Sequence, residues 1–429
     1  MNVIYDISVL GLGYYNEKAK TGIYRVIENV ARELLLSDCQ ISFSATHALL
    51  ETINFLKTSP EFQHVPLCTW SSSLMNRVMD TFISHTSPKP CSFSSNKNAF
   101  EQKVIIKDLI SKIHIKSLIK SIISKTTLLN HSFQSADIFH STFYPLPFRM
   151  PSGNNNRFIT IYDLIPIIHP EYFVSSVKYL IRRVVKSIQN DDWVIAISES
   201  TKNDLCNLTK LEPERVFVTL LAASDLFYHC IDASLQRSVR KKYGIPDSKY
   251  VLSLSTLEPR KNIDHTIRCF INMIQQQNIH DLNLVLVGTK GWDFEKIFSE
   301  VRYSGVLCDK IIITGFVDDY DLAPLYSGAT MFVYPSFYEG FGLPVLEAMQ
   351  CGVPVVTSNT SSLPEVVGDA GFLLDPRDSN SLCQCMLNIY NDPALAKKMS
   401  LKSISRAKMF SWKRCGEQTI AAYKYACNN

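Results

Sequence analysis

Short apolar runs alternate along this chain with longer segments in which apolar residues recur every three or four positions. The pattern is clearest from residue 251 onward, where the runs are VLSLST, NLVLVG, IIITG, TMFVYP and PVVTS. Such short runs predict strands that are buried on both faces, and the segments between them predict helices. This alternation is typical of a parallel, doubly wound sheet.

The N-terminal part repeats the alternation. We expect a strand over residues 3–8, a loop that contains Gly11 and Gly13, and a helix over 22–36 with one apolar face. Further predicted elements are strands at 41–44, 138–140, 158–162 and 193–197 and a helix at 177–188.

Length and charge limit the class of protein. A chain of 429 residues and 48.6 kDa is long for one core and suits two domains of about 200 residues each. Because residues 227–250 lack a clear strand, we expect an N-terminal domain over 1–230 and a C-terminal domain over 231–410. The formal charge is +4, which is too small to indicate a nucleic-acid partner.

Cysteine use and hydropathy indicate the compartment. The 12 cysteines are scattered without a C-x-x-C pair, which is typical of buried thiols in a reducing compartment. The opening MNVIYDISVLG has the pattern of a strand and not of a signal peptide. No apolar run reaches the ~18 residues that indicate a membrane span. We therefore expect a cytoplasmic protein.

Residues 334–356, YPSFYEGFGLPVLEAMQCGVPVV, carry the strongest chemical pattern. A predicted strand ends in a glycine-bearing loop, and Pro344 opens a short helix. The loop and the positive end of that helix suit a phosphate. Glu339 lies before the helix and Glu347 within its first turn, and this segment contains no cation to pair with either. Hydrogen bonding to ligand hydroxyl groups is thus their more natural role, which predicts a nucleotide-sugar site. The alternative is a βαβ crossover whose glycines only make turns.

A second pattern is STLEPRKNI, residues 255–263, at the end of a predicted strand and the start of a helix. Ligands of open α/β sheets bind beyond the carboxyl ends of the strands. Arg260 and Lys261 are therefore placed to meet a diphosphate and to stabilise its charge as it leaves. The alternative is an exposed pair of cations without a ligand.

Both patterns resemble the signature of the retaining glycosyltransferases of family 4. That family has the GT-B fold, in which two facing Rossmann-like domains, each a doubly wound parallel sheet, enclose an interdomain cleft. The resemblance covers nearly the whole chain, is most specific over 255–376 and is weakest over 40–135. In the second pattern, Ser255 stands where the family usually has glycine. The family has two glutamates separated by seven residues, and the matching positions here are Glu339, Phe341, Gly342, Glu347, Ala348, Met349, Gly352 and Pro354.

The resemblance implies a role for each matched residue. Glu347 would bind the ribose hydroxyl groups, Glu339 the hydroxyl groups of the donor sugar, and Arg260 and Lys261 the diphosphate. It also implies that the final helix, over 411–429, packs back on the N-terminal domain. Further implied donor contacts are Gly22, Val317, Gly340, Phe341, Gly342, Leu343 and Pro344.

One position departs from the family. Its members commonly have His-Asp where this chain has Tyr162-Asp163, and their histidine lies near the transferred sugar. Asp163 is a candidate catalytic residue, whereas a phenol at 162 can hydrogen-bond but is unsuited to acid–base work at neutral pH. His140, at the end of another predicted strand, is a second candidate to line the cleft, although a core role is more usual for a lone histidine. We interpret His169 as a loop residue.

For three further features of the sequence, two interpretations remain open. Trp292 is either a donor contact or a core aromatic residue. Asp318 and Asp319 lie near the implied base contact, or they cap a helix over 320–326. Arg25, in the first helix, contacts a phosphate or acceptor, or it is an ordinary surface residue.

Residues 101–125 indicate a partner. They contain six lysines and two acidic residues, with isoleucine and leucine at most positions between them. A basic amphipathic helix of this kind can lie on an anionic membrane, which here would be the inner face of the cytoplasmic membrane. The alternative is an ordinary helix that packs its apolar face on the domain.

The expected function follows from these features. We expect a retaining transferase that moves a sugar from a nucleoside-diphosphate sugar, with GDP-mannose as the leading donor, to a glycan or lipid-linked acceptor. The resembling enzymes build O-antigen, lipopolysaccharide and other bacterial surface polysaccharides, and many are mannosyltransferases. No group of Asp, Glu or His has metal-ligand spacing, so we expect neither a metal nor a cofactor. Alternatives are a sugar-nucleotide epimerase or hydrolase of the same fold, and a non-catalytic nucleotide-sugar-binding subunit.

Overall fold

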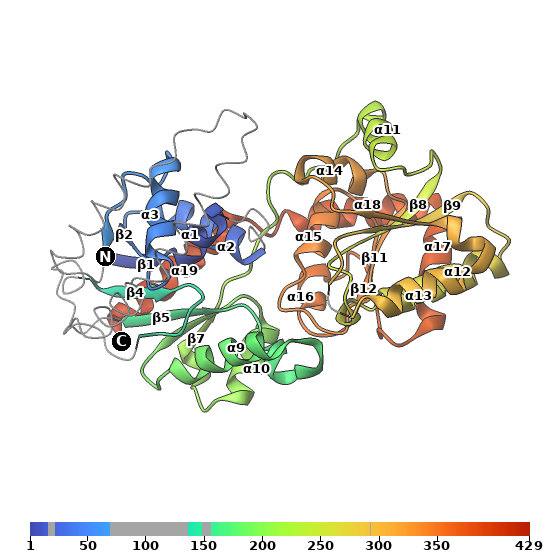
Figure 1. Ribbon diagram of the computed structural model, residues 1–429. Coiled ribbons are helices and arrows are strands. Elements are labelled where there is room, and N and C mark those ends of the chain that lie inside the picture. The colour runs from blue at the N-terminus through green and yellow to red at the C-terminus, as the bar shows by residue number, and fades with distance from the viewer. Residues whose placement is uncertain (16–21, 69–135, 148–155, 292) are drawn as a thin grey trace, which may run out of the picture. The chain divides into compact units, whose positions relative to one another are not determined.

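A computed structural model of the protein describes residues 1–15, 22–68, 136–147, 156–291 and 293–429 (Figure 1). Its contacts divide the chain into two compact units. The first comprises 1–19, 38–140 and 147–157, and the second comprises 20–37, 141–146 and 158–429. The lysine-rich segment 101–125 and Trp292 lie outside the described residues, so their interpretations stay predictions.

The described elements alternate between strands and helices. The strands are β1 (Asn2–Asp6), β2 (Gln40–Ser44), β3 (Leu67–Cys68), β4 (Ile138–Ser141), β5 (Asn156–Ile161), β6 (Trp193–Ala196), β7 (Val216–Val218), β8 (Lys249–Leu254), β9 (Leu282–Val287), β10 (Ile311–Gly315), β11 (Met331–Tyr334), β12 (Val355–Ser358) and β13 (Phe372–Leu374). The α-helices are α1 (Ser8–Tyr15), α2 (Gly22–Leu35), α3 (Leu49–Thr58), α8 (Ile165–Ile168), α9 (Ser175–Ser187), α10 (Glu199–Leu208), α11 (Ala233–Lys242), α12 (Ile263–Gln276), α13 (Glu295–Tyr303), α14 (Asp319–Ser327), α15 (Leu343–Gln350), α16 (Leu363–Val367), α17 (Ser379–Asn391), α18 (Pro393–Ala407) and α19 (Trp412–Asn428).

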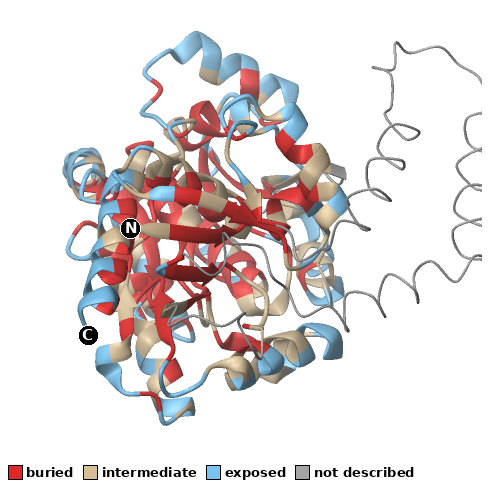
Figure 2. Cartoon of the chain, turned by 90° about the vertical axis from the view of Figure 1, so that its left-hand side faces the viewer, coloured by how far each residue is buried: buried red, intermediate tan, exposed pale blue. Residues whose placement is uncertain are grey.

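The strands form two parallel sheets. The first sheet has the order β3-β2-β1-β4-β5-β6-β7 and the second has β10-β9-β8-β11-β12-β13. In the first, Val3 of β1 pairs with Ile41 of β2 on one side and with Ile138 of β4 on the other. The strands predicted from apolar runs are thus confirmed. Figure 2 shows their buried residues enclosed by helices that are exposed on the outside.

One predicted loop is wrong. The stretch with Gly11 and Gly13 is not a loop but belongs to α1, which packs against α3. A side chain at Gly11 would overlap the backbone of Thr52 in α3. The glycine therefore permits close helix–helix approach instead of a turn. Sequence alone favoured the turn, because glycine is a weak helix former.

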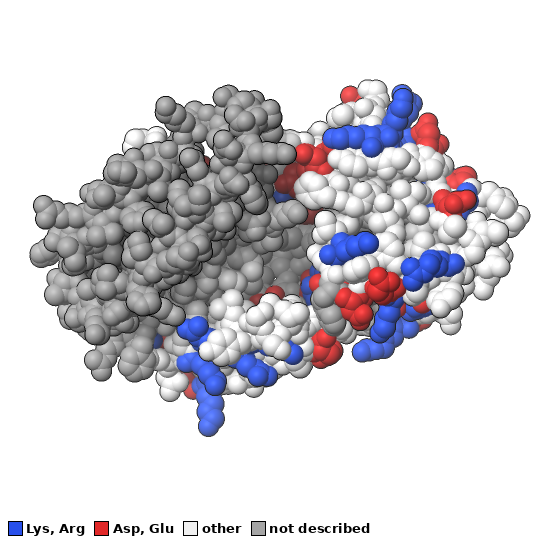
Figure 3. All heavy atoms as spheres, in the orientation of Figure 1, with Lys and Arg blue, Asp and Glu red and all other residues white. Residues whose placement is uncertain are grey.

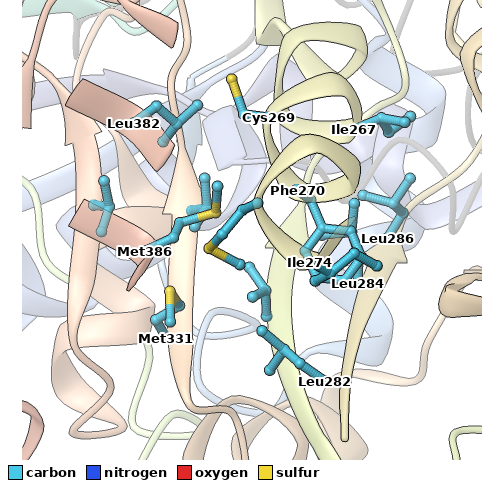
Figure 4. Close-up of a cluster of buried hydrophobic side chains, with 14 of the residues drawn as sticks. Ile267, Cys269, Phe270, Ile274, Leu282, Leu284, Leu286, Met331, Leu382 and Met386 are labelled. Atoms are coloured by element: carbon cyan, nitrogen blue, oxygen red, sulfur yellow. The ribbon is translucent and has the colours of Figure 1, made fainter. Parts of the chain in front are cut away.

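The core of the second sheet lies under α12 and α17. Phe270 and Ile274 of α12 face Leu284 and Leu286 of β9, and Met386 of α17 completes the layer (Figure 4). The opposite face carries α14 and α15, where the Tyr326 ring lies 5.3 Å from the Phe332 ring. With both faces covered, the strands are mostly apolar, as parallel strands usually are.

Helix α19 is the predicted final helix and packs on α2. The Tyr423 ring stands edge-on to Phe158 of β5 at 4.9 Å, and the Tyr425 ring stands edge-on to Trp193 of β6 at 5.8 Å. Between residues 227 and 250, where no strand was expected, the structure has α11. The domain boundary at residue 230 stays a prediction.

Candidate active site

A cavity of about 620 Å³ lies in the second compact unit. It opens where β8 and β11 end and where α12 and α15 begin. Residues from α2 and from the segment after β5 also line it. Its lining brings together every predicted catalytic and donor-binding residue, namely Gly22, Asp163, Arg260, Lys261, Val317, Glu339, Gly340, Phe341, Gly342, Leu343, Pro344 and Glu347.

Glu339 lies at the centre of a network of donors. Its Oε1 accepts a hydrogen bond from Lys261 Nζ at 2.6 Å and lies 3.0 Å from an Arg260 guanidinium nitrogen. The hydroxyl groups of Ser336 and Tyr334 donate to the same oxygen at 2.6 and 2.9 Å. The carboxylate is therefore paired and fixed, although its own sequence segment contains no cation.

This network determines the protonation of Glu339. Burial opposes ionisation, but the charges of Arg260 and Lys261 and the hydrogen bonds outweigh it, so the pKa of Glu339 is lowered to about 2. Burial lowers the pKa of Lys261 against the opposing effect of Glu339. For Arg260, burial is outweighed by Glu339 and Glu258, and the pKa is raised. Glu339 is thus ionised at neutral pH.

Arg260 has two further partners. It pairs with Glu258 at 2.8 Å and donates to the Tyr338 carbonyl oxygen at 2.6 Å. Two cations and two carboxylates then form one group of zero formal charge, in which Lys261 and Glu339 are buried and Arg260 and Glu258 are half-buried. The sequence placed the cations at the strand end correctly but missed their pairing with Glu339, since Lys261 and Glu339 are 78 positions apart.

Glu347 has quite different surroundings. Helix α15 begins at Leu343, so Glu347 lies in its second turn and not, as predicted, in its first. Its Oε2 accepts a 3.3 Å hydrogen bond from Tyr326 of α14. Burial is the largest influence and raises the pKa of Glu347 to about 7, although Arg25 and Tyr326 oppose the rise. Glu347 is therefore a buried carboxyl group near its titration point at neutral pH.

The start of α2 lies beside the start of α15. A Cβ atom at Gly22 would be 3.3 Å from Leu343 Cδ1, so glycine keeps this approach open. Arg25 pairs with Asp319 of α14 at 2.5 Å and also lines the cavity, so both interpretations of Arg25 stay open. Asp318 does cap α14, because its side chain accepts from Tyr320 N at 3.0 Å. Val317 is buried beside them.

Tyr162, which departs from the family pattern, lies next to the loop that contains Glu339 and Gly340, here called the glutamate loop. The backbone of Gly340 passes so close to the Tyr162 carbonyl oxygen that any side chain at residue 340 would clash. The Tyr162 side chain is buried, which raises the pKa of its hydroxyl group. Burial also raises the pKa of Asp163, whose carboxylate accepts from Ile165 N. Both residues line the cavity.

The two histidines are placed differently. His140 is 1% exposed in the first compact unit and stands edge-on to Tyr5 at 5.2 Å, which favours the core role. Burial lowers its pKa to about 3. His169 follows α8 directly, and its side chain caps no helix. Its ring lies 5.1 Å from the Tyr338 ring, beside the glutamate loop.

Hydroxyl groups that sequence reasoning missed hold the glutamate loop. Ser361 Oγ accepts from Glu339 N at 2.9 Å, and Ser362 Oγ donates to the Glu339 carbonyl oxygen at 2.9 Å. From the other side, Ser198, the N-cap of α10, donates to the Gly340 carbonyl oxygen at 2.8 Å. The run SNTSSLP after β12 was the available signal, because such residues hydrogen-bond backbone groups.

Among the residues that the structure describes, no group of three His, Cys, Asp or Glu side chains is arranged to hold a metal ion. Within the same ranges, no helix is long and apolar enough to cross a membrane.

Known proteins share both sequence and fold with this chain. Residues 236–406 match the family model described as glycosyl transferases group 1. The chain is 35% identical over 288 residues to O-antigen chain mannosyltransferase B from Escherichia coli. This match covers 67% of the chain and 74% of that protein. It is 30% identical over 266 residues to the serotype-specific mannosyltransferase WbdA from Escherichia coli, covering 61% of this chain but 32% of WbdA, so it spans about a third of that protein.

Among solved structures, HepE from Anabaena in complex with UDP has a TM-score of 0.65 at 16% identity, with 99% of each chain covered. At this identity the likeness shows the fold alone. It confirms the expected class of two Rossmann-like, parallel-sheet domains.

Proposed function

This chain belongs to the group 1 glycosyltransferases, and we propose that it transfers mannose from GDP-mannose to a glycan or lipid-linked acceptor of a bacterial surface polysaccharide. Two relatives that are at least 30% identical are named as mannosyltransferases, and one of these names specifies the O-antigen chain. These names support mannose as the transferred sugar and O-antigen, the polysaccharide part of lipopolysaccharide, as the product.

The observation that carries the proposal is the composition of one cavity. It combines a fixed anion at Glu339, a titratable carboxyl group at Glu347, the buried cation of Lys261 and the half-buried cation of Arg260. A nucleoside-diphosphate sugar offers ribose and sugar hydroxyl groups to the carboxylates and a diphosphate to the cations. The volume of about 620 Å³ lies within the range typical of small-molecule sites.

We assign the donor groups accordingly. Glu347 binds the ribose hydroxyl groups, and Glu339 accepts from hydroxyl groups of the transferred sugar while it holds Arg260 and Lys261. The two cations stabilise the charge that grows on the leaving diphosphate. The start of α15, with Gly340, Phe341, Gly342, Leu343 and Pro344, faces the donor phosphates, and Gly22 and Val317 approach from other elements.

The proposed transfer retains the anomeric configuration. The acceptor hydroxyl oxygen bonds to the anomeric carbon on the face from which the diphosphate leaves, the carbon–oxygen bond to the diphosphate breaks, and a phosphate oxygen takes the acceptor proton. This step needs no protein nucleophile. Asp163 is the remaining candidate catalytic residue, since it lines the cavity beside Glu339 and Arg260.

We propose that the reaction needs no metal, because Arg260, Lys261 and the start of α15 supply positive charge for the diphosphate. Activity should therefore survive EDTA. Loss of activity that a divalent ion restores would contradict this proposal.

We also place the reaction in the cytoplasm, at the inner membrane surface. The cysteines of the described residues are all free thiols, which supports a reducing compartment. For membrane contact the support is the composition of residues 101–125, in which lysines alternate with isoleucine and leucine.

A donor panel tests the proposal directly. Bound ligand raises the melting temperature by mass action, so GDP-mannose should stabilise the protein more than UDP- or dTDP-sugars do. Incubation with GDP-mannose and an O-antigen-type acceptor should then give an α-linked mannoside, identified by the anomeric coupling in NMR spectra. If only a sugar nucleotide with another base stabilised the protein, GDP-mannose would not be its donor. A β-linked product would refute the proposal that the transfer retains the anomeric configuration.

One observation favours a second candidate, a non-catalytic nucleotide-sugar-binding subunit. Tyr162 replaces the family's histidine, and its hydroxyl group is buried with a raised pKa. Donor binding without turnover on any acceptor, and restoration of turnover by Tyr162→His, would support this candidate. An epimerase or hydrolase would instead change GDP-mannose in the absence of any acceptor.

A further inference from the structure

Helix α9 carries positive charge only. Over Ser175–Ser187 it contains Lys178, Arg182, Arg183 and Lys186 and no acidic residue. Figure 3 shows lysine and arginine side chains gathered over the part of the surface where Figure 1 places α9 and α10.

The helix turns Arg182, Arg183 and Lys186 to solvent, and Lys178 is half-buried. Val184 is the buried residue of its inner face. Lys178, Arg182 and Lys186 follow one another at intervals of four, which places them in one row along the outside. Tyr179 is 65% exposed, and Arg183 lies over its ring at 5.8 Å. Val174, the residue before the helix, is 54% exposed. The outer surface therefore combines cations with exposed aromatic and aliphatic side chains.

These charges have no acidic partners within the described part of the chain. None of the ion pairs found there includes a cation of α9, and Lys178 Nζ has only a 3.4 Å contact with the Pro170 carbonyl oxygen. The basic helix α11 differs, since Arg240 pairs with Asp247 and Lys242 with Asp321. Of the acidic residues that flank the helix, Glu171 is paired with His169, and the buried Asp192 accepts from Gln189 N. Asp191 belongs to none of the ion pairs found among the described residues.

We propose that the outer face of α9 docks on an anionic lipid bilayer. Lysine and arginine are attracted to acidic headgroups, and tyrosine favours the boundary between headgroups and hydrocarbon. An anionic polymer would use the cations but would leave Tyr179 and Val174 in water, so a lipid surface matches more of the observed side chains. Phe173, directly before Val174, lines the cavity. Docking through α9 thus brings the cavity close to the lipid surface, whatever sugar the enzyme transfers.

The test compares two charge reversals of equal size. Arg182→Glu with Lys186→Glu changes the charge of α9 by −4. Lys397→Glu with Lys398→Glu makes the same change on α18, where neither lysine belongs to an ion pair of the described residues. Co-sedimentation is measured at low salt with vesicles of phosphatidylglycerol and phosphatidylcholine, and with phosphatidylcholine alone. Circular dichroism and the melting temperature establish that both variants fold.

The wild type and the α18 variant should bind the anionic vesicles alike, and the α9 variant should bind at least about tenfold more weakly. Added salt should weaken wild-type binding, and Tyr179→Ala should reduce the binding that persists at high salt. Equal loss in both variants would show a general charge effect and overturn the proposal. Unchanged binding of the α9 variant would also overturn it and would leave residues 101–125 as the docking segment. Binding of the wild type to heparin but not to vesicles would refute the lipid partner.

Discussion

Glu339 and Glu347 come from one short sequence pattern and line one cavity, yet their surroundings are opposite. Glu339 sits in a loop with four donors on a single oxygen, and its pKa is lowered to about 2. Glu347 sits in a helix with one hydrogen bond from Tyr326, and its pKa is raised to about 7. Both are almost fully buried, so burial does not distinguish them. The difference comes from the cations at residues 260 and 261.

The comparison separates two uses of a carboxylate. With two cations beside it, Glu339 is held as a charge and orients the groups around it. Glu347 is held mainly as a hydrogen-bonding group, and its charge is costly until a ligand or proton arrives. The same residue type therefore gives an electrostatic centre in one place and a titratable contact eight positions later.

The largest expected effect comes from Glu339→Ala. It leaves the buried Lys261 and the half-buried Arg260 without their shared anion, which should lower the free energy of unfolding by about 3–5 kcal/mol and abolish turnover. Affinity for a free nucleoside diphosphate should persist or rise, because the cations become available to the phosphates. Urea unfolding and calorimetry measure the two effects. Glu258→Gln is the matched control, since it removes the other partner of Arg260 and leaves Lys261 paired. A loss of nucleotide affinity equal to that of Glu347→Ala would contradict the division of roles.

Stability should depend on pH through Glu347. Its pKa is about 7 in the folded protein against an ordinary value of 4.5, so the folded protein keeps a proton that the unfolded chain releases. The contribution of the Glu347 proton to the free energy of unfolding is fully present below pH ~4.5 and is lost as the pH rises to about 7, a change of about 3 kcal/mol. Glu347→Gln should remove this slope, so that the variant becomes the more stable protein at pH 8. The exposed Glu295→Gln should keep the wild-type slope. If the free energy of unfolding changed with pH in the same way in the wild type and in Glu347→Gln, Glu347 would be ionised over the whole pH range measured.

Glu347→Ala should weaken nucleotide binding by about 1.5–3 kcal/mol, because ribose hydroxyl groups lose a charged or strongly polar partner. Calorimetry with GDP measures the change, and the 2′,3′-dideoxy nucleotide provides the control. If the ribose contact is correct, the variant should bind both nucleotides equally. Unchanged GDP affinity would remove Glu347 from the binding site.

The smallest expected effect distinguishes the two tyrosines. Tyr326→Phe removes the hydrogen bond to Glu347 and should raise its pKa further, at a cost of ~1 kcal/mol. Tyr334→Phe removes one of several donors to Glu339, so that glutamate should remain ionised at neutral pH. The free energy of unfolding is measured against pH for both variants, and the midpoint of its change reports the pKa of the affected glutamate. A shift of this midpoint for Tyr334→Phe but none for Tyr326→Phe would contradict the contrast drawn between Glu339 and Glu347.

Local patterns predicted most of the fold. The strands of the second sheet appear as apolar runs because helices cover both faces, and Pro344 with Gly352 delimits α15 within two residues. The failure at Gly11 has a tertiary cause, since only the presence of Thr52 explains a glycine inside a helix. Local propensity contains no information about such a neighbour.

Prediction of the site stopped at the same limit. The sequence identified Glu339, Glu347, Arg260 and Lys261 through motif spacing. Their pairing was not predictable, because it depends on the strand order that places β8 beside β11. Likewise, the contact from Ser198 to Gly340 joins residues 142 positions apart. Spacing thus identifies reactive residues, whereas their charge state depends on neighbours from distant parts of the chain.

The packing of α19 has a consequence for how the protein is made. Phe158 and Trp193 belong to strands that are translated well before α19, which carries their edge-on neighbours Tyr423 and Tyr425. Until α19 has been translated, these two large side chains lack that cover. The nascent chain therefore carries an apolar surface that a chaperone can bind, and this surface closes only when α19 arrives.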